Sequence, residues 1–213
     1  MAGSSGSRSL YDFTLVGGTW SFDGEDRHEW WQYDSAFAAF LKAHGLNPSH
    51  PVPFIWSSDI DGGFRWPWTK RKFRDWESAG YALAYYLDDV PPERRLVIAH
   101  SHGGQVALFA ASQGTRIAQL VTVGTPVRRD MREVRALARP NIKHWLHVHV
   151  KADRMQRLGE LFDGHLGIHR EFEEADVNAH VDDRKVGHSG VLTRAEYFRL
   201  WIANGWLDYF VED

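Results

Sequence analysis

The stretch Leu96-Val97-Ile98-Ala99-His100-Ser101-His102-Gly103-Gly104 decides the fold of this chain. It begins with four apolar residues that are typical of a buried strand, and an apolar helical pattern follows its two glycines. A serine on a sharp turn between a strand and a helix projects its hydroxyl beyond the sheet, and small neighbours leave room for a substrate. Amides of the first helical turn also face that hydroxyl. The stretch therefore predicts a nucleophile at Ser101.

Short β-rich runs alternate with longer amphipathic runs on both sides of this stretch, a pattern typical of parallel strands joined by helices. We expect strands at Asp12–Val16, Val52–Trp56, Leu96–His100, Ile117–Val123 and Trp145–Val150, and a weaker one at Asp176–Val181. We expect helices at Asp34–Ala43, Asp75–Leu87, Gly104–Ser112, Asp130–Ala138 and from about Arg194, with Thr193 as its cap and Glu196 completing a capping box. The pattern predicts an α/β fold: an open, mostly parallel sheet of about six strands, with helices on both faces and the site at the carboxyl ends of strands.

The 213 residues carry a formal net charge of −3 and no cysteine. A chain of this length fits one domain, which we place at residues 11–213, with residues 1–10 as a flexible leader or a cloning remnant. The charge balance excludes an electrostatic case for a nucleic-acid partner, and no apolar run reaches the ~20 residues of a membrane span. We expect a small-molecule partner and a cytoplasmic protein, with secretion after signal removal and the oligomeric state left open.

Two further polar residues follow predicted strands at the edge where Ser101 is expected. Asp153 comes shortly after the strand that ends at Val150, and His188 lies in the loop Gly187–Gly190 after the weaker strand. An imidazole titrating near ~6.5 can accept the serine proton, and a buried carboxylate can orient that imidazole. We predict His188 as the base and Asp153 as the acid. The competing carboxylates are Asp163, Asp176, Asp182 and Asp183, and the competing histidines are His180, His100 and His102.

The chain order Ser101, Asp153, His188, together with the serine turn, resembles the α/β-hydrolase family, whose nucleophile, acid and histidine occur in that order. The resemblance extends from Asp12 onward and implies a small lipase-like or esterase-like enzyme with a minimal lid or none. Gly124-Thr125-Pro126 and Gly187-His188-Ser189-Gly190 also look like lipase segments.

The family resemblance implies where the oxyanion hole lies. By this match, the backbone amide of His102 is one donor and that of Thr19 is the other, with Gly18 as the alternative to Thr19. Two positions depart from the family pattern: Gly17 replaces a histidine, and Ala99 replaces the first glycine of G-x-S-x-G. Because of the departure at Gly17, the hydrogen-bond arrangement of the oxyanion loop stays open.

Aromatic residues near the predicted strand ends are candidates for substrate contact. We expect Trp20, Trp56, Phe64 and Trp66 to wall a pocket for an acyl or aryl group, although such rings also pack helices onto sheets. His147 and His149 share a strand face, and His165 and His169 are close in sequence, but no carboxylate completes a familiar metal-ligand pattern. We therefore expect neither a metal nor another cofactor.

These residues predict a serine hydrolase that cleaves carboxylic esters, of small molecules or lipids, through an acyl-enzyme. Acyl transfer and amide cleavage use the same three residues and remain alternatives. A non-catalytic binding protein on the same scaffold is a third possibility, because fold does not determine function.

Overall fold

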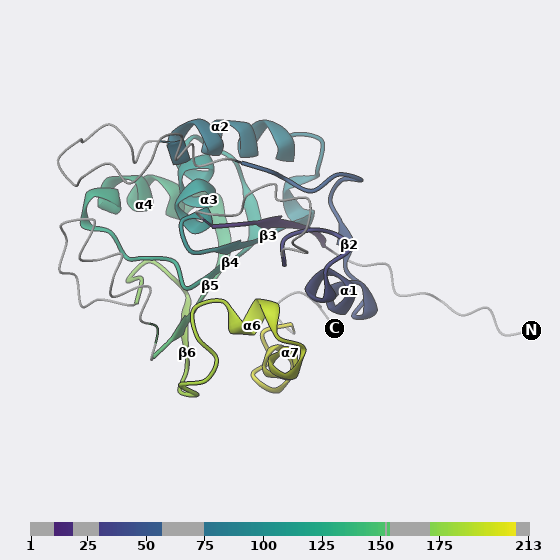
Figure 1. Ribbon diagram of the computed structural model, residues 1–213. Coiled ribbons are helices and arrows are strands. Elements are labelled where there is room, and N and C mark those ends of the chain that lie inside the picture. Colours follow the sequence, from purple (N-terminus) through teal and green to yellow (C-terminus); the bar gives the residue numbers. More distant parts are fainter. Residues whose placement is uncertain (1–10, 19–29, 57–74, 152, 154–170, 208–213) are drawn as a thin grey trace, which may run out of the picture.

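The computed structural model describes residues 11–18, 30–56, 75–151, 153 and 171–207. Its centre is a six-stranded open sheet in which every neighbouring pair is parallel (Figure 1). The strands lie in the spatial order β2 (Asn47–Pro48), β1 (Asp12–Val16), β3 (Arg95–His100), β4 (Ile117–Val123), β5 (Ile142–Val150) and β6 (Val177–Val181). The carboxyl ends of all these strands therefore meet at one edge.

Helices cover both faces of the sheet (Figure 1). One face carries α2 (Asp75–Leu87), α3 (Gly103–Ser112) and α4 (Arg132–Ala138), and the other carries α1 (Ala36–Ala43), α6 (Gly190–Thr193) and α7 (Ala195–Ala203). Short 3₁₀ turns stand at Pro92–Arg94, Arg129–Met131 and Arg139–Asn141. The predicted α/β architecture is confirmed.

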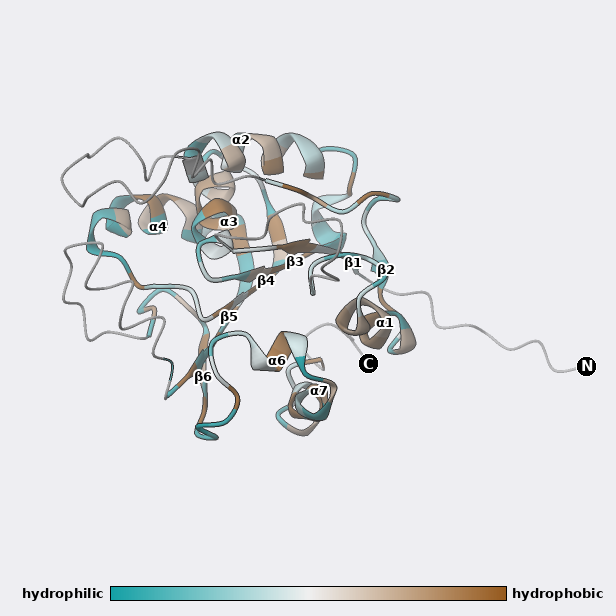
Figure 2. Ribbon diagram, viewed as in Figure 1, coloured by the Kyte–Doolittle hydropathy of each residue, from teal (hydrophilic) through white to brown (hydrophobic). Residues whose placement is uncertain are grey.

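The sheet divides the hydrophobic core into two clusters, one on each face. Every residue of β3 and β4 is buried, which explains why the apolar residues of these strands, such as Leu96–Ala99, do not alternate with exposed polar ones. Figure 2 shows the hydrophobic colouring concentrated on the central strands, between the two helical layers. The described part of the chain contains no helix long and apolar enough to cross a membrane.

The prediction of a strand at Val52–Trp56 is wrong, and the edge strand is instead the short β2. Ser49 N still donates to the Phe13 carbonyl over 2.9 Å, but Pro51 and Pro53 have no N–H to continue the ladder. The carbonyl of Val52 accepts instead from the Tyr86 hydroxyl over 2.6 Å. Two prolines thus override the apolar pattern of this segment.

The expected cap of the last helix is also wrong. Thr193 ends α6, and its hydroxyl donates to the Ser189 carbonyl over 3.2 Å, while Arg194 occupies the cap position of α7. A separate turn of helix before α7 therefore displaces the capping residue. Helix α1 begins at Ala36, two residues later than expected. The Ser35 hydroxyl accepts from the Ala38 amide over 3.1 Å and caps the helix there. The predicted leader at residues 1–10 lies outside the described residues.

Candidate active site

The serine turn lies directly between β3 and α3. Ser101 has φ 53°, the single positive value among the described residues other than glycine, and its amide donates to the Val123 carbonyl of β4 over 2.9 Å. Such a backbone conformation costs about 1–3 kcal/mol and persists only where the surroundings hold it. Gly103 permits this turn, because a Cβ there would lie 2.6 Å from the Val16 carbonyl oxygen. The turn presents Ser101 at the carboxyl edge of the sheet.

The segment after β1 packs directly against this turn. A Cβ added to Gly18 would lie 2.8 Å from the Ser101 Cβ and 3.1 Å from the His100 carbonyl oxygen, so only glycine allows this approach. The Trp56 indole N–H donates to the Gly17 carbonyl over 2.8 Å. Thr19, the preferred second donor, and Trp20 lie outside the described residues. Gly17 and Gly18 are therefore the described part of the expected oxyanion loop, and Gly18 borders Ser101.

Asp153 and His188 form a close pair at the same edge. The His188 Nδ1 lies 2.5 Å from the Asp153 Oδ2, with the Asp153 side chain fully buried and that of His188 20% exposed. Asp153 reaches this place because its amide turns back to the Val150 carbonyl at the end of β5, over 3.0 Å. A carboxylate buried against one ring nitrogen keeps the other ring nitrogen available as a proton acceptor.

The end of β4 lies next to both the His188 imidazole and the serine turn. A Cβ at Gly124, the residue after Val123, would lie 3.1 Å from the His188 Cε1, and Val123 itself accepts from the Ser101 amide. Among the described residues, no hydrogen bond joins the Ser101 hydroxyl to His188. In enzymes without bound substrate, a hydrogen bond between a nucleophile and its base is commonly long and tightens in the complex. The three predicted residues thus gather at one corner of the sheet.

The competing carboxylates that the structure describes have other partners. Asp176 accepts from the Trp145 amide over 2.7 Å, and Asp182 lies 3.2 Å from Lys151 Nζ. Asp183 accepts from the Lys185 amide over 2.8 Å. Asp163 lies outside the described residues. None of these described carboxylates contacts His188.

The competing histidines also separate in space. His180 lies on β6, 56% exposed, with its Nε2 3.6 Å from Asp182. His100 and His102 flank the serine but point apart: the His100 ring packs on His188, with centroids 4.5 Å apart, whereas the His102 ring lies 6.5 Å from that of Trp76. His188 is therefore the histidine paired with the buried carboxylate.

Comparisons with known proteins agree with this architecture at the level of fold. Neither a protein-family model nor a curated protein matches the sequence. A CIB-like hydrolase of Thermoplasma acidophilum is 17% identical with a TM-score of 0.53, covering 98% of this chain and 90% of that one. The esterase domain of a Rhodothermus marinus protein is 13% identical with a TM-score of 0.55, covering 97% and 90%. An esterase of Pyrococcus furiosus is 12% identical with a TM-score of 0.51, covering 96% and 82%. The fold is α/β-hydrolase-like.

His100 is a residue at this edge of the sheet whose role the sequence left open. In the sequence it is a competitor of His188 for the role of the base, whereas in the structure its Nε2 lies 3.3 Å from the His188 carbonyl oxygen. Burial, followed by electrostatic repulsion from His188, lowers the His100 pKa to about 3. The imidazole is therefore neutral at physiological pH. Its position directly before the serine is the sequence signal that could have found it.

Only some of the residues expected to contact substrate, and some of the histidines considered for a metal, lie among the described residues. Trp56 is buried at 8% exposure in the core around α2 and α3, while Phe64 and Trp66 lie outside the described residues, as do His165 and His169. His147 bonds Thr122 over 2.8 Å, and within the described ranges no group of three or more His, Asp or Glu side chains could hold a metal ion.

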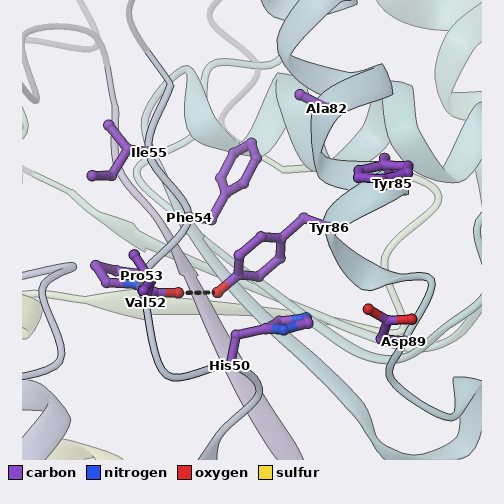
Figure 3. A pocket seen from close by; sticks show the side chains of 9 residues that line it. All are labelled: His50, Val52, Pro53, Phe54, Ile55, Ala82, Tyr85, Tyr86 and Asp89. Atoms are coloured by element: carbon purple, nitrogen blue, oxygen red, sulfur yellow. Dashed lines mark hydrogen bonds between the residues drawn. The ribbon is translucent and has the colours of Figure 1, made fainter.

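A groove lies elsewhere on the surface, between the segment after β2 and the last turns of α2 (Figure 3). Its volume is about 520 Å³, and its walls are mainly aromatic and aliphatic. Tyr86 crosses it and donates to the Val52 carbonyl, as the dashed line in Figure 3 marks. None of its lining residues is one of the predicted site residues.

Proposed function

We propose that this protein is a serine hydrolase that cleaves carboxylic esters through an acyl-enzyme intermediate. The observation that carries the proposal is the buried Asp153–His188 pair, 2.5 Å apart, at the sheet corner where Ser101 holds φ 53°. A structural ion pair would not require a strained serine beside it, and a strained serine alone would have no base. Together they supply a nucleophile, a base and a group that orients the base.

The reaction begins with attack of the Ser101 Oγ on the ester carbonyl carbon while His188 Nε2 takes the hydroxyl proton. The forming imidazolium is stabilised by Asp153, whose carboxylate is fully buried against Nδ1. Collapse of the tetrahedral intermediate breaks the bond to the alcohol oxygen, and that oxygen receives the proton from His188. Water then attacks the acyl-enzyme by the same steps and releases the carboxylic acid and free Ser101.

The developing oxyanion needs fixed donors, because one such donor is typically worth ~10²–10³ in turnover. We assign these roles to the backbone amides of His102 and of Thr19, with Gly18 as the alternative. The close approach of Gly18 to the Ser101 Cβ supports this assignment. Because Trp56 donates to the Gly17 carbonyl, it anchors this loop from the core side.

Esters are the substrate class to test first. Two of the structural neighbours, from Rhodothermus marinus and Pyrococcus furiosus, are named esterases, which supports this choice. Trp20, Phe64 and Trp66 remain the proposed substrate contacts, whereas Trp56 is buried in the core and supports the loop through the Gly17 carbonyl. An acyl-chain-length series on chromogenic esters would measure the size of the pocket that they form.

The test is covalent labelling of the purified protein with a fluorescent fluorophosphonate. The wild type should be labelled, Ser101→Ala should not, and Ser112→Ala should behave as wild type because Ser112 lies at the far end of α3. Labelling that persists in Ser101→Ala would contradict the nucleophile. Product analysis with an added alcohol or amine then separates hydrolysis from acyl transfer. Failure of activated esters to react with the folded protein would instead favour a non-catalytic binding role.

A further inference from the structure

His100 lies between the two loops that build the proposed site. On one side its ring packs against the His188 ring, with centroids 4.5 Å apart, and its Nε2 lies 3.3 Å from the His188 carbonyl oxygen. On the other side Gly18 passes close by, since a Cβ there would lie 3.4 Å from the His100 Nδ1. The Trp30 ring packs edge-on against the His100 ring, and their centroids are 5.9 Å apart. His100 is 7% exposed.

The geometry determines which proton His100 carries. A carbonyl oxygen accepts only, so the contact with the His188 carbonyl requires an N–H on Nε2. A neutral imidazole with a proton on Nε2 has a free lone pair on Nδ1. Burial and the charges of His188 and His102 lower the His100 pKa, the hydrogen bond to the His188 carbonyl and the charge of Asp153 raise it, and the result is about 3. Near neutral pH the ring therefore donates to His188 without carrying a charge.

We infer that His100 is a positioning residue: it holds the backbone and ring of His188 at the proposed site by donating its Nε2–H to the His188 carbonyl and by packing at a tilt against the imidazole. The inference rests on the proposed function, because it gives His100 a role in presenting the proposed base. His188 is anchored at two points, Asp153 through its ring and His100 through its backbone. Two anchors define the direction of Nε2 better than one, since a ring with a single hydrogen bond can rotate about it.

Neutrality matters to this role. During attack, His188 gains a proton and becomes positive, and a second charge on a ring whose centroid lies 4.5 Å away would oppose that step. The buried setting keeps His100 uncharged through the catalytic range, so the ring supports His188 without repelling its imidazolium. A lysine or arginine in the same place would offer a donor but add the charge.

The test compares His100→Gln with His100→Asn in the full chain. The Gln amide nitrogen is as many bonds from Cα as imidazole Nε2, so it can reach the His188 carbonyl, whereas the shorter Asn side chain matches Nδ1 and cannot. Both replacements are neutral and polar, which makes them a matched pair. His44→Asn, at an exposed position, serves as a control for the substitution itself.

We expect His100→Asn to lower kcat about 10–100-fold with KM within about twofold, because misplacing the base affects the chemical step more than substrate binding. His100→Gln should recover most of that loss. In proton NMR, the downfield resonance of the Asp153–His188 hydrogen bond should persist in His100→Gln and broaden or shift in His100→Asn. This readout works in a folded variant whatever its turnover.

The outcomes separate this inference from the proposed function. If the wild type neither turns over esters nor takes the fluorophosphonate label, the proposed function fails. If the wild type is active and His100→Asn and His100→Gln have equal kcat values and equal downfield resonances, whether high or low, the inference about His100 is overturned. A loss in His100→Asn with recovery in His100→Gln supports it.

Discussion

Replacing His100 with glutamine should make the protein less sensitive to mild acid. The imidazole is 7% exposed, and burial first, then the charge of His188, lowers its pKa to about 3. In an unfolded chain the same imidazole titrates near ~6.5. Between these values the unfolded chain binds a proton that the folded protein rejects. Protonation of His100 in the unfolded chain therefore lowers the free energy of unfolding of the wild type as the pH falls.

The sign and size follow from linkage. A depressed folded-state pKa gives stability that is complete above about pH 6.5 and is lost as pH falls toward about 3. Each unit of pKa difference is worth about 1.36 kcal/mol, so the loss attributable to His100 is about 2 kcal/mol at about pH 5. It is about 4 kcal/mol at about pH 3 and levels off near about 5 kcal/mol below that pH. Glutamine does not titrate, so the variant lacks this loss.

The assay is urea unfolding at about pH 7.5 and about pH 5, read by tryptophan fluorescence. Between the two pH values the wild type should lose about 2 kcal/mol more free energy of unfolding than His100→Gln. Any constant cost of the substitution cancels in this difference. His44→Gln, at an exposed position, should follow the wild type. Parallel pH curves for the wild type and His100→Gln would refute the claim that His100 is buried and neutral.

Three further substitutions test the site and its support. Asp153→Asn should leave KM nearly unchanged and lower ester kcat about 10³–10⁴-fold, because the amide favours the wrong ring tautomer of His188; steady-state kinetics measure this, and a kcat near the wild-type value would remove Asp153 from the triad. Gly18→Ala places a methyl group 2.8 Å from the Cβ of the nucleophile, so kcat should fall about 10–100-fold with an unchanged circular dichroism spectrum. An active Gly18→Ala would show that this loop lies farther from the serine. Gly104→Ala overlaps the Thr125 side chain and should destabilise the fold by about 1–3 kcal/mol, seen as a lower Tm in calorimetry. An unchanged Tm would mean that the turn accommodates the methyl group.

Local pattern was enough to find most elements of the sheet. β1, β4 and β6 follow their apolar runs closely, and α2 matches Asp75–Leu87. In each case the residues that define the element are neighbours in sequence and their periodicity reflects burial on the sheet. The expected strand at Val52–Trp56 failed because its prolines cannot donate to a ladder, a backbone constraint that outweighs its apolar side chains.

The sequence by itself determined the strand-turn-helix around Ser101, because its apolar run and its small residues act within a few positions of one another. It also placed Asp153 and His188 beyond strand ends, as parallel strands require. Only the tertiary structure decided that these two side chains meet at 2.5 Å, and that His100 supports His188 from a position 88 residues away. Contacts of this kind depend on the order of strands in the sheet and on the loops that follow them. A linear pattern contains neither, so the partners of a buried imidazole become visible only after the chain has folded.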